Sequence, residues 1–266
     1  MNASYGIVDD LVDGGVVRWD KPAWCKLPEV GLASAFDGIL VENLVFQVLR
    51  QQFKGSPCYE ELVDLFLETT FGFYLGQNDD IHIAKPGRAM LEDFTLTRYQ
   101  MAARLKTSLI EFYSPVAAAL LACGVQDPKA YAAARDISVD MSLILQIVDD
   151  YNDCFGDDKS DVSLDIRNGC CTWMILEAKK IANASQKKIL QENYGYDDQS
   201  KVDVVKQIFD ELGLKKRVMD YRQMLFHSVI AKIEQNAEIL PPNIYNYALE
   251  IHQDYSVEWC QRNQVE

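Results

Sequence analysis

The spacing of apolar residues is the feature that most constrains the fold of this chain. Apolar residues recur every three to four positions along segments of helical length, and alternation with a period of two is essentially absent. This pattern predicts helices, because one face of a helix repeats every 3.6 residues whereas one face of a strand repeats every two. The expected helices cover residues 32–53, 58–80, 95–123, 128–153, 172–194, 199–212, 215–236 and 241–260. Pro115 is expected to kink or break the third of them.

The connections between these segments are short, marked by glycines and prolines, and none is long enough to be a domain linker. A chain of 266 residues with 48% hydrophobic content is long enough to bury one large core. We therefore predict an all-α fold in which residues 1–266 form a single-domain helical bundle.

Composition excludes several classes of protein. The net charge of −14 argues against a nucleic-acid-binding surface. The seven cysteines form no CxxC pair and no metal-ligand spacing with the three histidines, which favours free thiols and a cytoplasmic protein. No uninterrupted apolar run reaches the roughly 18 residues of a membrane span, and the first residues, MNASYGIVDD, do not resemble a signal peptide.

Two copies of the pattern Asp-Asp-x-x-Asp lie far apart in the chain. The first consists of Asp9, Asp10 and Asp13, and the second of Asp149, Asp150 and Asp153. On a helix, residues four apart lie on one face, so each copy would direct its carboxylates to one place. Mg²⁺ is held in proteins by one or two carboxylates together with waters and substrate phosphates. Two such clusters facing each other would hold a diphosphate through Mg²⁺.

One copy alone would fit a solvated acidic helix end equally well. The second copy, however, follows LILQIV, an apolar run typical of a buried helix. A carboxylate pair at the end of such a helix is costly unless a metal ion or a partner neutralises it. This context favours the metal-binding interpretation.

The longer segments around these motifs resemble the trans-isoprenyl diphosphate synthase family, most closely farnesyl diphosphate synthases of the animal type. The similar segments are VDDLVDGGVVRWDKPAWCKLPEVGL, GQNDD, RYQMAARLKTSLIEFYSPVAAALLACG, LQIVDDYNDCFGD, LDIRNGCCTWMI and IFDELGLKKRVMDYRQMLFHSVIAKIEQ. They occur in the family's order over about residues 3–236.

The resemblance implies a bundle of the isoprenoid (class I terpenoid) synthase type with a central cavity, and a homodimer or a heterodimer with a paralogue. An allylic diphosphate, dimethylallyl or geranyl, would bind through three Mg²⁺ ions between the acidic motifs. Its diphosphate would leave, the double bond of isopentenyl diphosphate would attack the carbocation, and a proton would then be lost.

The resemblance also assigns roles to single residues. Asp9, Asp13 and Asp149 are the leading metal ligands, followed by Asp10, Asp150 and Asp153. Arg18 and Lys106 match residues that contact the allylic diphosphate; Thr107, Gln77 and Gln146 match residues near the reacting carbon. Tyr5, one turn before Asp9, matches the floor that limits product length. The small Ser4 beside it is expected to leave room for about ten to fifteen carbons or somewhat more.

The departures from the family pattern concern the isopentenyl diphosphate half-site. Trp19 stands where the family has a second arginine, and Asp161 and Cys170 stand where it has lysines. The chain begins shortly before the first motif, so the family's first helices are expected to be absent, as is its basic C-terminal tail. Binding of isopentenyl diphosphate is therefore in question.

Three functions remain open at this point. The first is a Mg²⁺-dependent prenyltransferase of the farnesyl or geranyl diphosphate synthase type. The second is a terpene synthase that ionises an allylic diphosphate without isopentenyl diphosphate, and the third is an inactive partner subunit of a paralogue. The acidic stretch 155–171 beside the second motif, which carries Asp157, Asp158, Asp161 and Asp165, fits either a lid over the metal site or an ordinary solvated loop.

Overall fold

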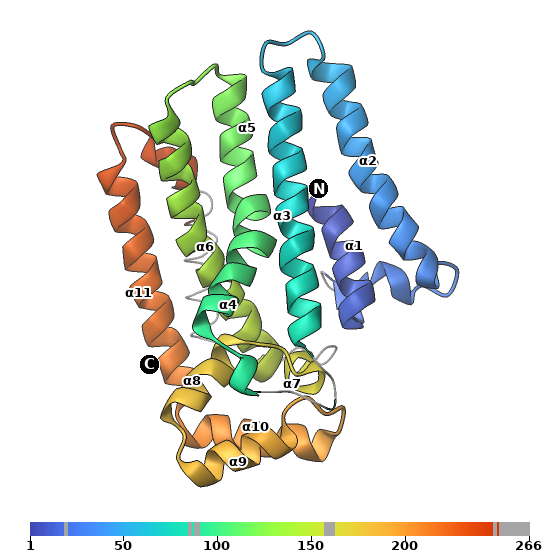
Figure 1. Cartoon of the computed structure of the whole chain (residues 1–266), viewed down its shortest axis with the longest axis vertical. Coiled ribbons are helices and arrows are strands. Elements are labelled where there is room, and N and C mark those ends of the chain that lie inside the picture. The colour runs from blue at the N-terminus through green and yellow to red at the C-terminus, as the bar shows by residue number, and fades with distance from the viewer. Residues whose placement is uncertain (19–20, 85–86, 88–90, 157–162, 247–248, 250–266) are drawn as a thin grey trace.

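A computed structural model describes residues 1–18, 21–84, 87, 91–156, 163–246 and 249 (Figure 1). The prediction of an all-α fold is confirmed. The α-helices are α1 (Asn2–Asp13), α2 (Ser34–Phe53), α3 (Tyr59–Ile83), α4 (Leu96–Ala102), α5 (Ser114–Ala122), α6 (Pro128–Phe155), α7 (Leu164–Asn168), α8 (Trp173–Ile181), α9 (Ala184–Asn193), α10 (Gln199–Glu211) and α11 (Leu214–Gln235). A π-helix spans Ala103–Tyr113, and 3₁₀ turns span Trp24–Lys26, Gly31–Ala33, Leu91–Asp93 and Pro242–Tyr245. The described strands, β1 (Val17–Arg18) and β2 (Lys21–Pro22), form one antiparallel hairpin.

Helix α6 runs through the middle of the bundle between α5 and α11, while α2 lies at the outer edge beside α3 and α1 (Figure 1). The buried apolar residues of α6 recur at helical spacing: Ala130, Ala133, Ala134, Ile137, Met141, Ile144, Ile147, Tyr151 and Cys154. One core joins α6 to α8, α10 and α11, and a second joins it to α3, the π-helix and α5. The first core holds α6 from Ile137 to Cys154, so the C-terminal end of this helix is a firm support for the second acidic motif.

The predicted long helix at 95–123 is three consecutive helical segments, α4, the π-helix and α5. Pro115 lies in the first turn of α5, directly after the π-helix, so its missing amide N–H falls where the helical hydrogen-bond pattern changes. The change of helix type therefore occurs beside Pro115 while the chain continues as a helix. Wide π-turns are found mostly at functional sites, and this one carries Lys106 and Thr107.

Helices α1 and α2 approach closely where Ser4 faces Gly38. The Ser4 hydroxyl donates a 2.8 Å hydrogen bond to the Gly38 carbonyl, and a Cβ atom at Gly38 would lie 2.8 Å from Val8 Cγ2. Ser4 is fully buried in this crossing and does not line the cavity described below. The expectation that its small size deepens the cavity is therefore wrong, because Ser4 makes room for α2.

Two other expected segments differ from the structure. Residues 172–194 form two helices, because the Asn183 side chain accepts from the amide of Gln186 and caps the start of α9. Within 155–171, residues 164–168 form the short helix α7. Asp157, Asp158 and Asp161 lie outside the described residues, as does the range 241–260 beyond Asn246 except for Leu249.

The outer side of α2 is apolar and exposed. Among the described residues, one stretch, Gly31–Phe53, is long and apolar enough to cross a membrane by length and composition, and 17% of its most apolar window is buried. The expectation of no membrane span rested on uninterrupted apolar runs, and this helix contains charged residues such as Asp37 and Glu42. Its exposed apolar residues are Leu32, Phe36, Ile39, Leu40, Leu44 and Val48.

Candidate active site

A cavity of about 520 Å³ opens between α1, the β1–β2 hairpin, α3, the π-helix and α6. Its wall includes acidic, basic, amide, hydroxyl and aromatic side chains from all five elements. The residues are Asn2, Ala3, Tyr5, Gly6, Ile7, Asp9, Asp10, Arg18, Lys21, Pro22, Trp24, Phe73, Lys106, Thr107, Glu111, Leu145, Gln146 and Asp149. Its volume is in the range of small-molecule sites.

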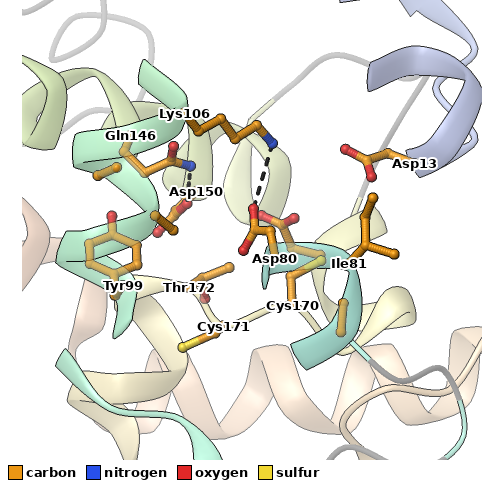
Figure 2. A pocket seen from close by; sticks show the side chains of 14 residues that line it. Asp13, Asp80, Ile81, Tyr99, Lys106, Gln146, Asp150, Cys170, Cys171 and Thr172 are labelled. Atoms are coloured by element: carbon orange, nitrogen blue, oxygen red, sulfur yellow. Dashed lines mark hydrogen bonds and ion pairs between the residues drawn. The ribbon is translucent and has the colours of Figure 1, made fainter. Parts of the chain in front are cut away.

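The two acidic motifs meet at this cavity. Asp9 and Asp10, near the C-terminal end of α1, and Asp149, in the last turns of α6, line the same cavity. Asp13 and Asp150 line an adjoining pocket of about 80 Å³, together with Asp80 and Asp165 (Figure 2). Five of the six predicted carboxylates therefore lie around two neighbouring hollows.

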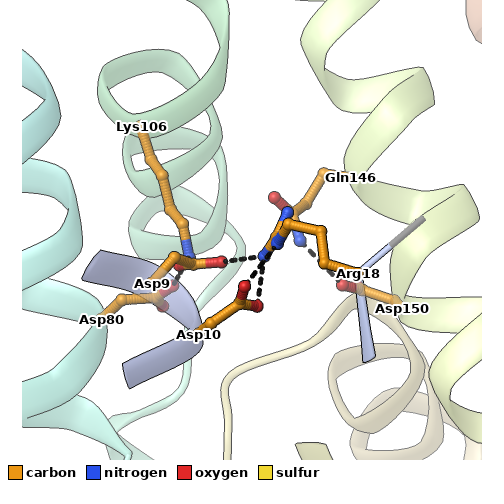
Figure 3. A network of polar contacts seen from close by, with 7 residues as sticks. All are labelled: Asp9, Asp10, Arg18, Asp80, Lys106, Gln146 and Asp150. Atoms are coloured by element: carbon orange, nitrogen blue, oxygen red, sulfur yellow. Dashed lines mark hydrogen bonds and ion pairs between the residues drawn. The ribbon is translucent and has the colours of Figure 1, made fainter. Parts of the chain in front are cut away.

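Arg18 neutralises the first motif from the hairpin. Its Nε donates to Asp10 Oδ2 at 2.8 Å and its Nη2 to Asp10 Oδ1 at 2.8 Å, which is a bidentate pair. The same Nη2 lies 3.2 Å from Asp9 Oδ2. The hairpin thus turns the guanidinium back over α1, as Figure 3 shows.

Lys106 contacts the first motif from the opposite side. Its Nζ lies 3.1 Å from Asp9 Oδ1 and 3.6 Å from Asp80 Oδ2. Burial by itself would raise the pKa of Asp9, but the charges of Lys106 and Arg18 outweigh it and hold this pKa below its usual value. At Lys106, the negative charges of Asp9 and Asp80 outweigh burial and raise the pKa of the ammonium.

The remaining carboxylates have too little positive charge around them. Burial, followed by repulsion from Asp9, raises the pKa of Asp13 to about 7. Burial also raises the pKa of Asp149 to about 6 and that of Asp150 to about 7. Solvent reaches Asp149 although many protein atoms surround it, because it lies on a concave wall. The ionised forms of these groups would be stabilised by a bound cation.

Asp150 and Asp153 also hold the backbone that follows the second motif. Asp150 Oδ2 accepts from the amide of Trp173 at 2.7 Å, at the start of α8, and its Oδ1 accepts from Gln146 Nε2 at 3.1 Å. Asp153 accepts from the amides of Leu164 at 2.8 Å and Asp165 at 3.2 Å, at the start of α7. These bonds satisfy orphan amides of two helix N-termini.

The predicted polar residues near the reacting carbon take different positions. Thr107 and Gln146 line the large cavity. Gln77 is buried, and its Oε1 has no hydrogen-bond partner in the part of the chain that the structure describes. Its neighbour Gly76 lies so close to the π-helix that a Cβ atom would be 2.9 Å from the amide nitrogen of Lys106. The Gly-Gln pair thus lets α3 pack directly against the segment that carries Lys106.

The inner end of the cavity is aromatic. The ring of Tyr5 stacks on Phe73 with centroids 4.1 Å apart, and both residues line the cavity. The Tyr5 hydroxyl forms a 2.8 Å hydrogen bond with Thr70 Oγ1, so its ring is fixed from both ends. The predicted floor residue therefore works with a second ring from α3 that sequence reasoning missed.

Other residues of the two hollows were also missed. Asp80 pairs with Lys106, and its position in GQNDD was the signal that could have identified it. Asp165 and Cys170 line the small pocket, and burial next to Asp165 raises the pKa of the Cys170 thiol. Lys21 and Glu111 line the large cavity, and no motif pointed to them. Trp19 lies outside the described residues.

The donor set suits a hard cation that also binds a substrate. Among the described residues, no three acidic, histidine or cysteine side chains converge closely enough to hold a metal ion by themselves. The carboxylates of Asp9, Asp13 and Asp149 nevertheless provide oxygen ligands from two sides, and burial disfavours their charge where no cation pairs with them. Mg²⁺ bound jointly by one or two carboxylates, waters and a diphosphate fits this arrangement.

Comparisons with known proteins agree with this geometry. The profile of the polyprenyl synthetase family matches residues 2–212. Farnesyl pyrophosphate synthase of Bos taurus is 33% identical over 247 residues, which are 92% of this chain and 70% of that protein. Farnesyl pyrophosphate synthase 1 of Cannabis sativa is 36% identical over 238 residues, 89% of this chain and 69% of that protein. Farnesyl pyrophosphate synthase of Artemisia annua is 35% identical over 238 residues, 89% of this chain and 69% of that protein. The chain belongs to the polyprenyl synthetase family.

Proposed function

We propose that this protein is a Mg²⁺-dependent prenyltransferase that condenses an allylic diphosphate with isopentenyl diphosphate. The single observation that carries the proposal is the meeting of Asp9 and Asp149, from the two acidic motifs, in one cavity that also holds Lys106 and Arg18. Carboxylates that could hold a metal ion and cations that could hold a diphosphate thus face the same space, beside an aromatic end suited to a prenyl chain.

The acidic residues would hold the metal. Asp9 and Asp13 from α1 and Asp149 from α6 are the leading ligands, while Asp10, Asp150 and Asp153 would support them. Bound Mg²⁺ supplies neutralisation of the charge that develops on the departing diphosphate. The expected number of ions is three.

Arg18 and Lys106 would bind the allylic diphosphate. In the free protein both neutralise Asp9. With Asp9 paired to a metal ion, the guanidinium and the ammonium would be free to bind the diphosphate oxygens without leaving this carboxylate uncompensated. They would then stabilise the leaving group as the carbon–oxygen bond breaks.

The carbocation would form next to Thr107 and Gln146, with Gln77 behind them. Hydroxyl and amide oxygens can orient their negative ends toward the cation, and a preformed dipole needs no reorganisation during the reaction. The double bond of isopentenyl diphosphate then attacks, and the released diphosphate is suited to accept the proton that is lost. The growing chain would extend toward Tyr5 and Phe73.

The names of the relatives favour this function over a terpene synthase and over an inactive subunit. The test is to incubate the protein with Mg²⁺ and geranyl diphosphate, with and without isopentenyl diphosphate, and to identify the products. Farnesyl diphosphate that forms only with isopentenyl diphosphate supports the proposal. A terpene alcohol or hydrocarbon released without it would replace the proposal with a terpene synthase, and a folded protein without turnover would overturn it.

The apolar side of the bundle would pair with a second copy of the chain. Exposed apolar residues lie at successive turns of two neighbouring helices, Phe36, Leu40, Leu44 and Val48 on α2 and Leu67, Phe71 and Leu75 on α3. A contiguous face of this kind on a water-soluble protein marks an interface. We propose a homodimer through this face in a cytoplasmic enzyme. If the face instead binds a paralogue or a membrane, the pure protein will not dimerise in solution.

A further inference from the structure

Two diphosphates must bind in one cavity, and that requires cations that are free to receive them. In the part of the chain that the structure describes, three basic residues line the cavity, Arg18, Lys21 and Lys106. Arg18 is paired with Asp10 and Asp9, and Lys106 with Asp9 and Asp80. Lys21 is exposed, and within the described residues it has no ion pair. Among the described residues that line this cavity, Lys21 is therefore the basic group that can bind an incoming anion without giving up an ion pair.

The β1–β2 hairpin places Lys21 beside Arg18. The two residues are directly opposite each other in the antiparallel register. Opposite residues of such a pair project from the same face, with Cβ atoms roughly 5 Å apart. Both side chains line the cavity, so the hairpin presents a second positive charge next to the one held by the first acidic motif.

The sequence explains why such a charge is needed. Trp19 stands where the family has its second arginine, and an indole offers neither the charge nor the paired donors of a guanidinium. Resting on the proposed function, we infer that Lys21 binds the diphosphate of isopentenyl diphosphate in place of that arginine. Lysine binds phosphate as a compact point charge, and its flexible stem can reach the anion from the neighbouring strand.

Lys21→Met tests this assignment, because methionine keeps an unbranched apolar chain and removes the charge. We expect the KM for isopentenyl diphosphate to rise about tenfold, as for the loss of one charge-assisted hydrogen bond. The KM for geranyl diphosphate should stay within about twofold. Lys21→Arg should keep the wild-type value, and adding Trp19→Arg to Lys21→Met should recover most of the loss.

Lys26→Met is the matched control, since Lys26 is also exposed, lies just beyond the hairpin and does not line the cavity. If the KM for isopentenyl diphosphate changed equally in both lysine variants, or did not change in Lys21→Met, the assignment of Lys21 would be overturned. Turnover by the wild-type protein would still support the proposed function. Titration with isopentenyl diphosphate by calorimetry separates the two ideas in the other direction. Suppose that the wild-type protein forms no product, and that Lys21→Met binds isopentenyl diphosphate more weakly than the wild type while Lys26→Met does not. This result would uphold the assignment of Lys21 and reject the prenyltransferase.

Discussion

Lys106 and Asp9 join the π-helix to the first acidic motif, with 3.1 Å between Nζ and Oδ1. Asp80 of α3 lies 3.6 Å from the same ammonium, so one lysine connects the π-helix, α1 and α3 (Figure 3). In the proposed function, Lys106 and Asp9 would give up this ion pair when the diphosphate and the metal ions bind.

Lys106→Met should lower kcat by about 10² to 10³, because a positioned charge on the departing diphosphate is lost. Product formation from geranyl and isopentenyl diphosphates measures the effect. Lys232→Met is the control, since Lys232 has a similarly shielded side chain and is paired with Asp136 and Asp140 away from the cavity. Equal losses in the two variants would show that Lys106 acts through stability only.

Asp149→Asn should weaken Mg²⁺-dependent binding of inorganic diphosphate at least about tenfold, since a neutral amide is a poor Mg²⁺ ligand. Calorimetric titration with and without Mg²⁺ measures this change. Asp153→Asn should instead cost about 1 kcal/mol of stability with little effect on binding, because Asp153 caps α7. If Asp153→Asn reduced Mg²⁺-dependent binding as strongly as Asp149→Asn, Asp153 would be a ligand of equal weight.

Acidification should stabilise the metal-free protein. The pKa of Asp150 is about 7 in the folded state, against roughly 3.9 in an unfolded chain. Between these values the folded state binds the extra proton, so the free energy of unfolding rises as pH falls. From pH 7.5 to 6, Asp150 alone adds about 1 kcal/mol, or about 2–4 °C in Tm.

Thermal melts in EDTA at several pH values measure this shift, and Asp150→Asn should reduce it while keeping an acceptor for the Trp173 amide. Asp13 and Asp149 shift the free energy of unfolding in the same direction. A Tm that falls over this pH range in the metal-free protein would contradict the raised pKa values.

Product length should depend on both rings at the inner end of the cavity. Phe73→Ala and Tyr5→Ala remove the stacked pair and should extend the main product by about one isoprene unit. Thr70→Val should broaden the product distribution, because the Tyr5 hydroxyl loses its partner. Chromatography of the dephosphorylated products gives the lengths.

Phe94→Ala controls for lost packing, because Phe94 is as buried as Phe73 but belongs to another core. If Phe94→Ala lengthened the product as much as Phe73→Ala, general loosening of the bundle would explain the result.

Leu40→Lys should disrupt the proposed dimer. Leu40 is 60% exposed in the single chain, and burying a leucine stabilises by about 1.5–3 kcal/mol. With two copies per dimer, the dissociation constant should rise about 100-fold or more. Sedimentation over a concentration series tests this expectation, with Met224→Lys on α11 as an equally exposed control. A wild-type monomer at high concentration would reject the interface.

Much of the fold could be predicted because helical spacing is a local property. The limits of α2, α3, α6, α10 and α11 agree closely with the expected ranges. The division of 172–194 was missed because it depends on a single capping side chain, Asn183. The π-helix was missed because its hydrogen bonds shift by one residue without changing which residues are apolar.

The candidate site was predictable in parts. Each acidic motif lies within one helix, so spacing correctly placed five of the six carboxylates around the two hollows, but Asp153 binds the amides at the start of α7 instead. The position of Ser4 could not be predicted from the sequence, because it depends on how closely α2 crosses α1 at Gly38. Lys21 carries no motif, and only its pairing opposite Arg18 brings it to the cavity.

Most of the helical ranges, the presence of two acidic motifs and the resemblance to a family followed from the sequence alone. The packing of the helices was needed to show that Asp9 and Asp149 line one cavity, that Asp153 accepts from the amides at the start of α7, and that Phe73 stacks on Tyr5. The reason is physical: helical periodicity follows from contacts within about one turn. The distance between side chains on different helices depends instead on how their surfaces pack, and small residues such as Gly38 and Gly76 set that distance here.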